Sequence, residues 1–254
     1  MTSKNARLLQ LLVLASLGGA IVYKFVSGTM YYYINDRFFL LVGFGAAGFL
    51  LLAGILLSTH WQADHDYDHG HDHDHDHDHE HTSGGFKWSL FFVALPVILA
   101  VFVPASPLGA SAITTRGITN TAPITTEGQN DLFQLQVPPN NRTILDWVRF
   151  FNFTVDLQQY VGQPADVVGF VYFDPRLGEG QFSVLRYTLS CCVADAFAIA
   201  MVVNWDDVDE LQPNSWVRVK GSVDIITLDD FNIPLIHAES IQVVEQPAQP
   251  YLLP

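Results

Sequence analysis

The chain has 254 residues, 49% of them hydrophobic, and 26 acidic against 12 basic residues give it a formal net charge of −14. Proteins that bind nucleic acid usually do so through clustered Lys and Arg, so this acidity argues against a nucleic-acid partner. The only cysteines, Cys191 and Cys192, are adjacent and cannot form a disulfide framework.

Two apolar stretches near the N-terminus predict transmembrane helices. Residues 8–26 contain one charge, Lys24, and residues 38–58 contain none. At about 1.5 Å per residue, both reach the roughly 30 Å thickness of a bilayer core. The first could instead be a cleaved signal peptide, because Lys4 and Arg7 precede it. Against this, it is longer than the apolar core of such peptides, and no small-residue cleavage site follows.

The second stretch carries small residues on several of its faces: Gly43, Gly45, Ala46, Ala47 and Gly48. Small residues let helices approach each other closely in lipid. They would serve either packing among the helices of this chain or contact with another membrane subunit.

A loop of alternating histidine and acidic residues follows. Residues 60–81 contain nine of the ten histidines and eight carboxylates, a composition that cannot build a hydrophobic core. Imidazoles on one side of an extended chain, or stacked at i, i+4 in a helix, suit zinc or another divalent transition metal. The predicted ligands are His60, His65, His69, His71, His73, His75, His77, His79 and His81. The alternatives are a solvated spacer and a loop that responds to pH, because histidine titrates near pH 6.5.

A third apolar stretch, residues 88–103, is shorter and contains Pro96, which predicts a kinked helix that needs its flanks to cross the membrane. The basic N-terminus favours an orientation with that end in the cytoplasm, the histidine-rich loop also inside, and the C-terminal domain outside. The sequence thus predicts a membrane region (1–104, with the loop at 59–86), a linker (105–142) and a soluble domain (143–254).

The soluble domain begins with a helical pattern and continues with an alternating one. Residues 143–160 have apolar residues at helical spacing, with Thr143 as the N-cap, and residues 205–211 are also helix-like. Five β-strands are predicted at residues 167–173, 182–192, 198–204, 216–226 and 235–244. Gly169 and Gly221 lie where strands would bend, which favours a five-stranded all-β barrel of the OB type over an open sheet or sandwich.

The sequence around the second predicted strand resembles a known family. The chain is similar to the YcgQ-like family of bacterial membrane proteins in residues 169–174 (GFVYFD), in the run from Arg186 through Ser190, Cys191 and Cys192 to Asp195, and in the terminal Gln249-Pro250-Tyr251. The resemblance extends over most of the chain. It implies an accessory subunit in the bacterial inner membrane, working beside a larger multi-span permease, and some family members are linked with zinc-responsive regulation.

Cys191 and Cys192 are the candidate site residues of the soluble domain. As neighbours in a strand they would point to opposite faces, one of them into the barrel. Three roles are open: burial as small apolar side chains, a redox pair, or metal ligation with Asp195 and His237. Cys191, Cys192 and Asp195 therefore join the histidines as predicted metal ligands.

Together these features predict an accessory membrane subunit of a permease that handles a divalent metal, in contact with lipid and with a larger multi-span permease subunit. The alternative is a membrane-anchored extracytoplasmic binding module without a role in transport. We predict no catalysis and no organic cofactor. The chain lacks a Cys-x-x-Cys spacing and a Ser/His/Asp arrangement, and His237 is the single histidine of the soluble domain.

Overall fold

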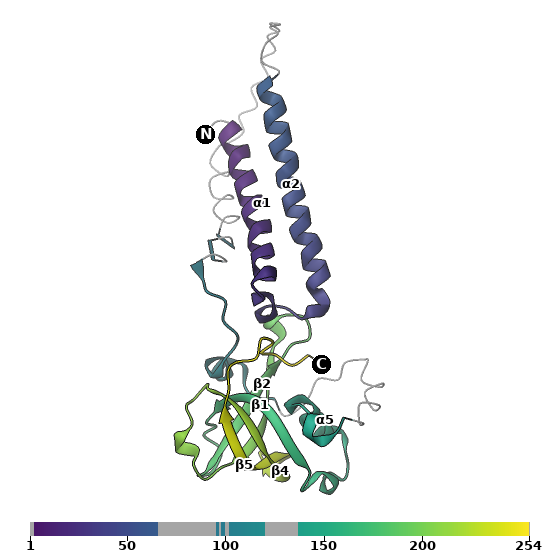
Figure 1. Cartoon of the computed structure of the whole chain (residues 1–254), viewed down its shortest axis with the longest axis vertical. Helices are drawn as coiled ribbons and strands as arrows, with labels where there is room; N and C mark the ends of the chain where they lie inside the picture. Colours follow the sequence, from purple (N-terminus) through teal and green to yellow (C-terminus); the bar gives the residue numbers. More distant parts are fainter. Residues whose placement is uncertain (1–2, 66–94, 97, 100–101, 120–136, 254) are drawn as a thin grey trace. The chain divides into compact units, whose positions relative to one another are not determined.

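A computed structural model describes residues 3–65, 95–96, 98–99, 102–119 and 137–253 of the chain (Figure 1). The chain divides into two compact units. We call residues 1–30 and 36–105 the helical unit, and residues 31–35 and 106–254 the barrel unit. The short segment 31–35 thus belongs to the barrel unit, although the chain on both sides of it belongs to the helical unit.

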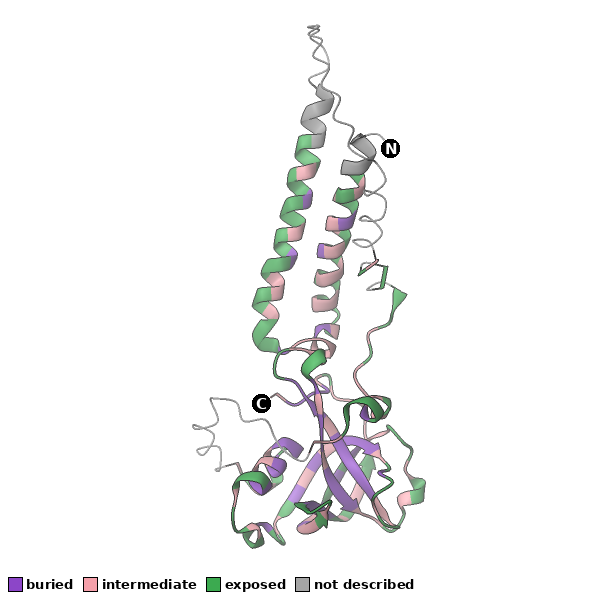
Figure 2. Ribbon diagram, turned by 180° about the vertical axis from the view of Figure 1, so that it is seen from behind, coloured by how far each residue is buried: buried purple, intermediate pink, exposed green. Residues whose placement is uncertain are grey.

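The helical unit contains two long helices, α1 (Ser3–Val26) and α2 (Phe39–His65). Both are long and apolar enough to cross a membrane, and few of their residues are buried (Figure 2). This confirms the first two predicted spans as apolar helices. The third predicted span, residues 88–103, and residues 66–81 of the histidine-rich loop lie mostly or wholly outside the described residues.

Small residues bring α1 and α2 into contact. A Cβ atom on Gly18 would lie 2.7 Å from Cγ of Leu50 and 3.3 Å from the carbonyl oxygen of Ala46, whose own side chain is buried. Packing within the chain therefore accounts for Ala46. At the four glycines of α2 a Cβ would meet no atom of the described residues within 4 Å: Gly43, Gly45, Gly48 and Gly54.

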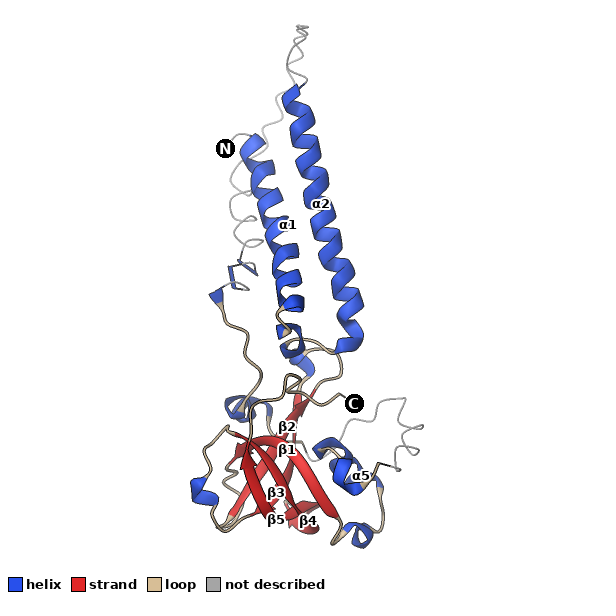
Figure 3. Ribbon diagram, viewed as in Figure 1, coloured by secondary structure: helices blue, strands red, loops and turns tan. Residues whose placement is uncertain are grey.

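The barrel unit is built on five strands that close into a barrel in the order β1-β2-β3-β5-β4 (Figure 3). The strands are β1 (Pro164–Tyr172), β2 (Gln181–Thr188), β3 (Phe197–Asn204), β4 (Trp216–Leu228) and β5 (Phe231–Val243). All neighbouring strands are antiparallel except β3 and β5, which are parallel. The five predicted strands are confirmed, although β2 ends four residues earlier than predicted.

In β4, side chains alternate between the barrel core and solvent, and the strand bends at a glycine. Val217, Val219 and Val223 are buried in the barrel core, whereas Arg218 and Lys220 between them point to solvent. At Gly221 the register shifts against β5, and a Cβ there would lie 2.0 Å from the carbonyl oxygen of His237. The glycine thus lets the two backbones approach at a bend, as predicted.

Helix α5 (Ile144–Phe153) contributes its apolar face to the same core. It begins with a capping box in which Thr143 and Asp146 exchange side-chain and backbone hydrogen bonds, which confirms Thr143 as the N-cap. The predicted helix was too long at its other end. Thr154 leaves helical geometry, and the side chain of Asp156 caps a separate 3₁₀ turn, Leu157–Tyr160.

The outer face of the barrel is covered as well. Phe170, Leu185 and Tyr187 form a second cluster with Ile113 of the linker and Tyr251 of the C-terminal tail. Residue 118 bridges to Ala198 of β3, and residue 252 bridges to Thr188 of β2. Because β2 is buried on both faces, its C-terminal end is firmly held, and the loop that follows begins at a well-defined position.

Candidate metal site at the loop between β2 and β3

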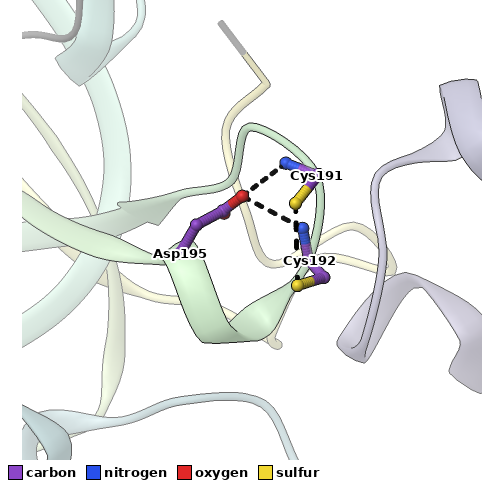
Figure 4. Close-up of side chains that lie close together, drawn as sticks. All are labelled: Cys191, Cys192 and Asp195. Atoms are coloured by element: carbon purple, nitrogen blue, oxygen red, sulfur yellow. Dashed lines mark hydrogen bonds between the residues drawn. The ribbon is translucent and has the colours of Figure 1, made fainter.

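Cys191 and Cys192 lie in the connection between β2 and β3, which we call the thiol loop (residues 189–193). The strand prediction for these two residues is wrong: β2 ends at Thr188, and a 3₁₀ turn (Val193–Asp195) leads into β3. Neither cysteine points into the barrel. Cys191 is exposed, Cys192 is half-buried, and both are free thiols (Figure 4).

The side chain of Asp195 binds the backbone N–H groups of the thiol loop. Its carboxylate accepts hydrogen bonds from the amides of Ser190 (3.1 Å), Cys191 (2.7 Å) and Cys192 (3.3 Å). These amides bind a carboxylate instead of a neighbouring strand, which is why β2 ends before them. Partial burial raises the pKa of Asp195, but the hydrogen bond from the Cys191 thiol and these backbone hydrogen bonds outweigh it and hold the pKa below its usual range.

Asn35 binds the carbonyl groups of the same loop. Its side-chain amide donates to the carbonyl oxygens of Ser190 (3.0 Å) and, at the limit of a hydrogen bond, Leu189 (3.5 Å). Its backbone N–H donates to the carbonyl oxygen of Cys191 (3.0 Å). Asn35 is 1% exposed, so the loop is held by Asp195 through its N–H groups and by a buried side chain through its carbonyls.

The two sulfur atoms are left on the outside of this loop, 3.7 Å apart. A disulfide bond would bring them to about 2.05 Å. Two sulfurs on one tetrahedral zinc, each about 2.3 Å from the metal, are about 3.8 Å apart. The spacing therefore fits two thiolates on one metal ion. One carboxylate oxygen of Asp195 and both sulfurs lie within 4.8 Å of one another.

The Cys191 thiol is not activated in this arrangement. The hydrogen bond to the Asp195 carboxylate, and then the contact with the Cys192 sulfur, raise the pKa of Cys191 to about 11. Catalytic thiols have pKa values lowered by nearby positive charge or a helix N-terminus. The site is therefore better suited to ligation, in which a metal displaces the thiol proton, than to nucleophilic chemistry.

The structure excludes His237 from this site. It lies on β5 opposite Asn204, at the end of β3 far from Asp195, and its ring nitrogen is 3.0 Å from the carboxylate of Asp224. His60 and His65 belong to the last turns of α2, in the helical unit. The other predicted histidine ligands lie outside the described residues: His69, His71, His73, His75, His77, His79 and His81.

Two features around the site were missed from the sequence. Asn35 carries no sequence signal for its role, because it is one of several polar residues between the first two predicted spans. The second feature is the tail: Arg186 donates hydrogen bonds to the carbonyl oxygens of Gln249 (2.6 Å) and Pro250 (3.1 Å). The family resemblance included Arg186, Gln249 and Pro250, but it did not indicate that Arg186 contacts the other two.

Comparisons with known proteins agree with the two-part organisation. Residues 9–119 match the DUF1980 N-terminal domain, and residues 141–254 match the DUF1980 C-terminal domain. The UPF0703 protein YcgQ of Bacillus subtilis is 22% identical over 96 residues, 37% of this chain and 34% of that protein. A Streptococcus mutans protein, named as a proposed subunit of a two-component membrane permease complex, is 26% identical over 96 residues, 37% of this chain and 35% of that protein.

The match thus spans about a third of the length of each curated relative. Among solved structures, a small single-stranded DNA-binding protein from Streptomyces coelicolor is similar to 33% of this chain and 93% of its own, with 13% identity and a TM-score of 0.22. So low a score carries no inference about function.

Proposed function

Since the chain belongs to the DUF1980 family and joins its two domains in one polypeptide, we propose that it is an accessory membrane subunit of a permease and that it handles a divalent metal such as zinc. The name of the Streptococcus mutans relative supports the first part. The geometry of Cys191, Cys192 and Asp195 supports the second.

An accessory role fits the apolar helices. Residues 39–58 of α2 contain no charged side chain, and in residues 8–26 the single charge is Lys24, near the end. A pathway for ions needs polar or charged groups at membrane depth. We infer that a larger multi-span partner supplies that pathway, and that this chain adds the membrane-anchored barrel.

The barrel has the strand number and the closed Greek-key arrangement of an OB fold, and we infer that type for it. OB barrels often bind oligonucleotides, but fold alone does not give function. From residue 105 onward the chain carries 17 acidic and seven basic residues. Such a surface would repel phosphates, so the barrel is proposed to serve a cation or a protein and not nucleic acid.

We infer a third membrane crossing, and the pairing of segment 31–35 supports it. This segment directly follows α1 and its neighbours, and it pairs with the thiol loop of the barrel. The barrel and the connection between α1 and α2 therefore share one side of a membrane that both helices cross. If α2 leads to the opposite side, the chain would have to cross again between residues 66 and 105, and we propose the predicted span 88–103 for that crossing.

The observation that carries the metal proposal is the 3.7 Å spacing of two sulfurs held next to a carboxylate by a fully hydrogen-bonded loop. Cys191 and Cys192 would be the thiolate ligands, and Asp195 would ligate the ion or hold the loop. A tetrahedral ion would keep at least one position open. Open positions suit a metal that is passed on, whereas closed sites with four protein ligands are structural.

Zinc binding to the purified full chain tests this proposal. All nine histidines of residues 60–81 are first replaced by serine, giving what we call the serine-loop chain, so that only the barrel site is measured. We expect one zinc per chain, lost when Cys191→Ser and Cys192→Ser are added. His237→Ala is the matched control and should bind zinc like its parent. If the serine-loop chain binds no zinc, the metal proposal is wrong.

Purification from native membranes tests the subunit proposal. We expect a multi-span membrane protein to co-purify with the tagged chain in mild detergent at a fixed ratio. Recovery of the chain alone, with zinc still bound at the thiol loop, would instead favour a membrane-anchored binding module that works without a permease.

A further inference from the structure

Segment 31–35, which we call the inter-helix segment, is attached to the barrel through the thiol loop. Ile34 forms an antiparallel bridge with Cys192. The N–H of Asn35 donates to the carbonyl oxygen of Cys191 (3.0 Å), and the N–H of Val193 donates to the carbonyl oxygen of Tyr33 (2.8 Å). These backbone bonds join the inter-helix segment, through an isolated β-bridge, to the residues that carry the thiols.

The side chain of Asn35 makes this attachment specific. It is buried, and its amide donates to the carbonyl oxygens of Ser190 and Leu189 on the N-terminal side of the cysteines. Moving the thiol loop away would cost these hydrogen bonds, and a buried amide that loses its partners is destabilising. The loop and the segment therefore stay together or separate together.

The same contacts fix the geometry of the two thiols. Asn35 holds the carbonyl groups of residues 189–191, and Asp195 holds the N–H groups of residues 190–192. A metal ion that binds both sulfurs needs this arrangement, since two adjacent side chains in a free loop would sample many spacings. A ligand that binds only one of two states shifts the equilibrium toward that state, and the effect is reciprocal.

We propose that a metal ion at Cys191 and Cys192 strengthens the attachment of the inter-helix segment to the barrel, so that metal occupancy is transmitted to the connection between α1 and α2. The inference rests on the metal site proposed above and adds a regulatory role to it. The covalent path is short: the segment follows α1 after four residues and precedes α2 by three. In a permease complex, the barrel would thereby report bound metal to the membrane helices.

Hydrogen exchange of the full-length serine-loop chain, with and without zinc ion, tests the proposal. The backbone N–H groups of Asn35 and Val193 are the reporters, because each bonds across the attachment. At free zinc about 100 times its dissociation constant, exchange through opening of the attachment should slow by about a hundredfold. The Cys191→Ser and Cys192→Ser double variant should show no zinc effect.

The outcomes separate this inference from the metal site itself. If one zinc binds per chain and exchange at Asn35 and Val193 is unchanged, the coupling is wrong while the metal site stands. If no zinc binds, both are wrong. If zinc slows exchange equally throughout the barrel, for example in β4, the ion only stabilises the fold and the coupling is again overturned.

The reciprocal effect is measured with Asn35→Ala. We expect zinc affinity to fall about tenfold, because the thiol loop loses one of the two side chains, Asn35 and Asp195, that anchor it. Asn232→Ala is the matched control: Asn232 is an exposed barrel residue outside the thiol loop, and its side chain accepts a hydrogen bond from the hydroxyl of Thr227 (2.9 Å). Unchanged affinity in a folded Asn35→Ala chain would contradict the coupling. Should that variant fail to fold, the exchange measurement on the unaltered segment decides.

Discussion

Asp195 determines the chemistry of Cys191 at the scale of single residues. Its carboxylate fixes the loop backbone and also accepts a hydrogen bond from the thiol. That hydrogen bond is the largest of the effects that raise the pKa of Cys191 to about 11, and the contact with the Cys192 sulfur is the next. An exposed cysteine would ordinarily be a reactive one. Here exposure and reactivity are separated, because the thiolate form is disfavoured by the neighbouring carboxylate.

We predict that Cys191 of the metal-free chain reacts slowly with iodoacetamide at pH 8. With a pKa of about 11, about 0.1% of the thiol is ionised at that pH, against roughly a quarter for a thiol of pKa 8.5. Because less acidic thiolates are intrinsically better nucleophiles, the net slowing should be about tenfold. The rate should rise tenfold per pH unit to about pH 11, measured by mass spectrometry of the alkylated peptide.

Asp195→Asn provides the comparison for this titration. It replaces the carboxylate, whose hydrogen bond contributes most to the raised pKa of Cys191, with a neutral and weaker acceptor of similar shape. Alkylation at pH 8 should become several-fold faster. A rate that levels off near pH 9 in the unaltered chain would show that Asp195 does not control the thiol.

The sequence was informative about part of this site only. Cys191, Cys192 and Asp195 are close in the chain, and local backbone geometry brings them together, as the prediction required. Asn35 lies 155 residues from Ser190, and no periodicity or spacing connects them. His237 was wrongly included, because strand order decides its position: β3 and β5 run parallel, and His237 pairs at the end of β3 that leads away from Asp195.

At the scale of elements, two glycines allow the strands to close. A Cβ on Gly169 would lie 2.5 Å from the carbonyl oxygen of Leu185, and one on Gly221 would lie 2.0 Å from that of His237. Both contacts are with backbone, which cannot move aside as a side chain can. At most core positions neighbouring side chains can move to accommodate a larger residue. At Gly169 and Gly221 they cannot, so we expect any larger side chain to be strongly destabilising there.

We predict that Gly221→Ala lowers the free energy of unfolding of the barrel by about 2–4 kcal/mol and that Gly169→Ala does so by a similar amount. Gly178→Ala is the control, because the nearest atom to its Cβ would be 3.7 Å away, on the flexible side chain of Gln181. Unfolding can be followed by tryptophan fluorescence of the full chain in detergent. Equal stability of all three variants would contradict the close approach at these bends.

Arg186 joins the C-terminal tail to β2. Its guanidinium donates to the carbonyl oxygens of Gln249 and Pro250 and lies 5.6 Å from the ring centre of Trp216. Burial lowers the pKa of Arg186 to about 10, so the side chain is still charged at neutral pH. Arg186 thus adds hydrogen bonds from a charged donor to the backbone bridge and the apolar cluster that also hold the tail.

We predict that Arg186→Leu releases the tail. The N–H of Leu252, which donates to the carbonyl oxygen of Tyr187 (2.8 Å), should exchange at least tenfold faster. Arg218→Leu is the control: it removes an exposed ion pair with Asp166, which is worth at most about 1 kcal/mol, and should leave Leu252 protected. Protection of Leu252 in both variants would mean that the tail is held by the cluster around Tyr251 alone.

The elements themselves were largely predictable, because burial on one face leaves a period in the sequence. β4 shows this best, with buried valines at alternate positions. Prediction failed where an element is not buried on a single face or where its end is set by a local hydrogen bond. β2 is buried on both faces, so its apolar run gave no sign of where the strand ends, and the amides of residues 190–192 bind Asp195 instead of continuing the sheet. The end of α5 depends on local capping by Asp156.

At the scale of the whole molecule, the proposed membrane topology rests on the pairing of the inter-helix segment and can be tested directly. We predict that residues 27 and 111 face the same side and that residue 82 faces the other. The test uses single cysteines, Ser27→Cys, Ser111→Cys or Thr82→Cys, in a chain with Cys191→Ser and Cys192→Ser. A membrane-impermeant maleimide is applied to right-side-out and inverted vesicles.

The three positions test separate steps. Labelling of residues 27 and 111 from opposite sides would contradict the pairing of segment 31–35 with the barrel. Labelling of residue 82 from the same side as residue 111 would remove the third crossing, and with it the prediction that the histidine-rich loop and the thiol loop lie on opposite sides of the membrane.

The attachment of Asn35 to residues 189 and 190 also sets an order of folding. The partners are separated by 154 and 155 residues, so the contact closes a loop that contains most of the chain. During synthesis from the N-terminus, the inter-helix segment emerges well before β2 exists, and such non-local contacts form late. The thiol loop can therefore bind the inter-helix segment only after the barrel has been synthesised, long after the segment itself. A chain whose synthesis stops before residue 189 cannot complete that return, so this contact separates finished chains from interrupted ones.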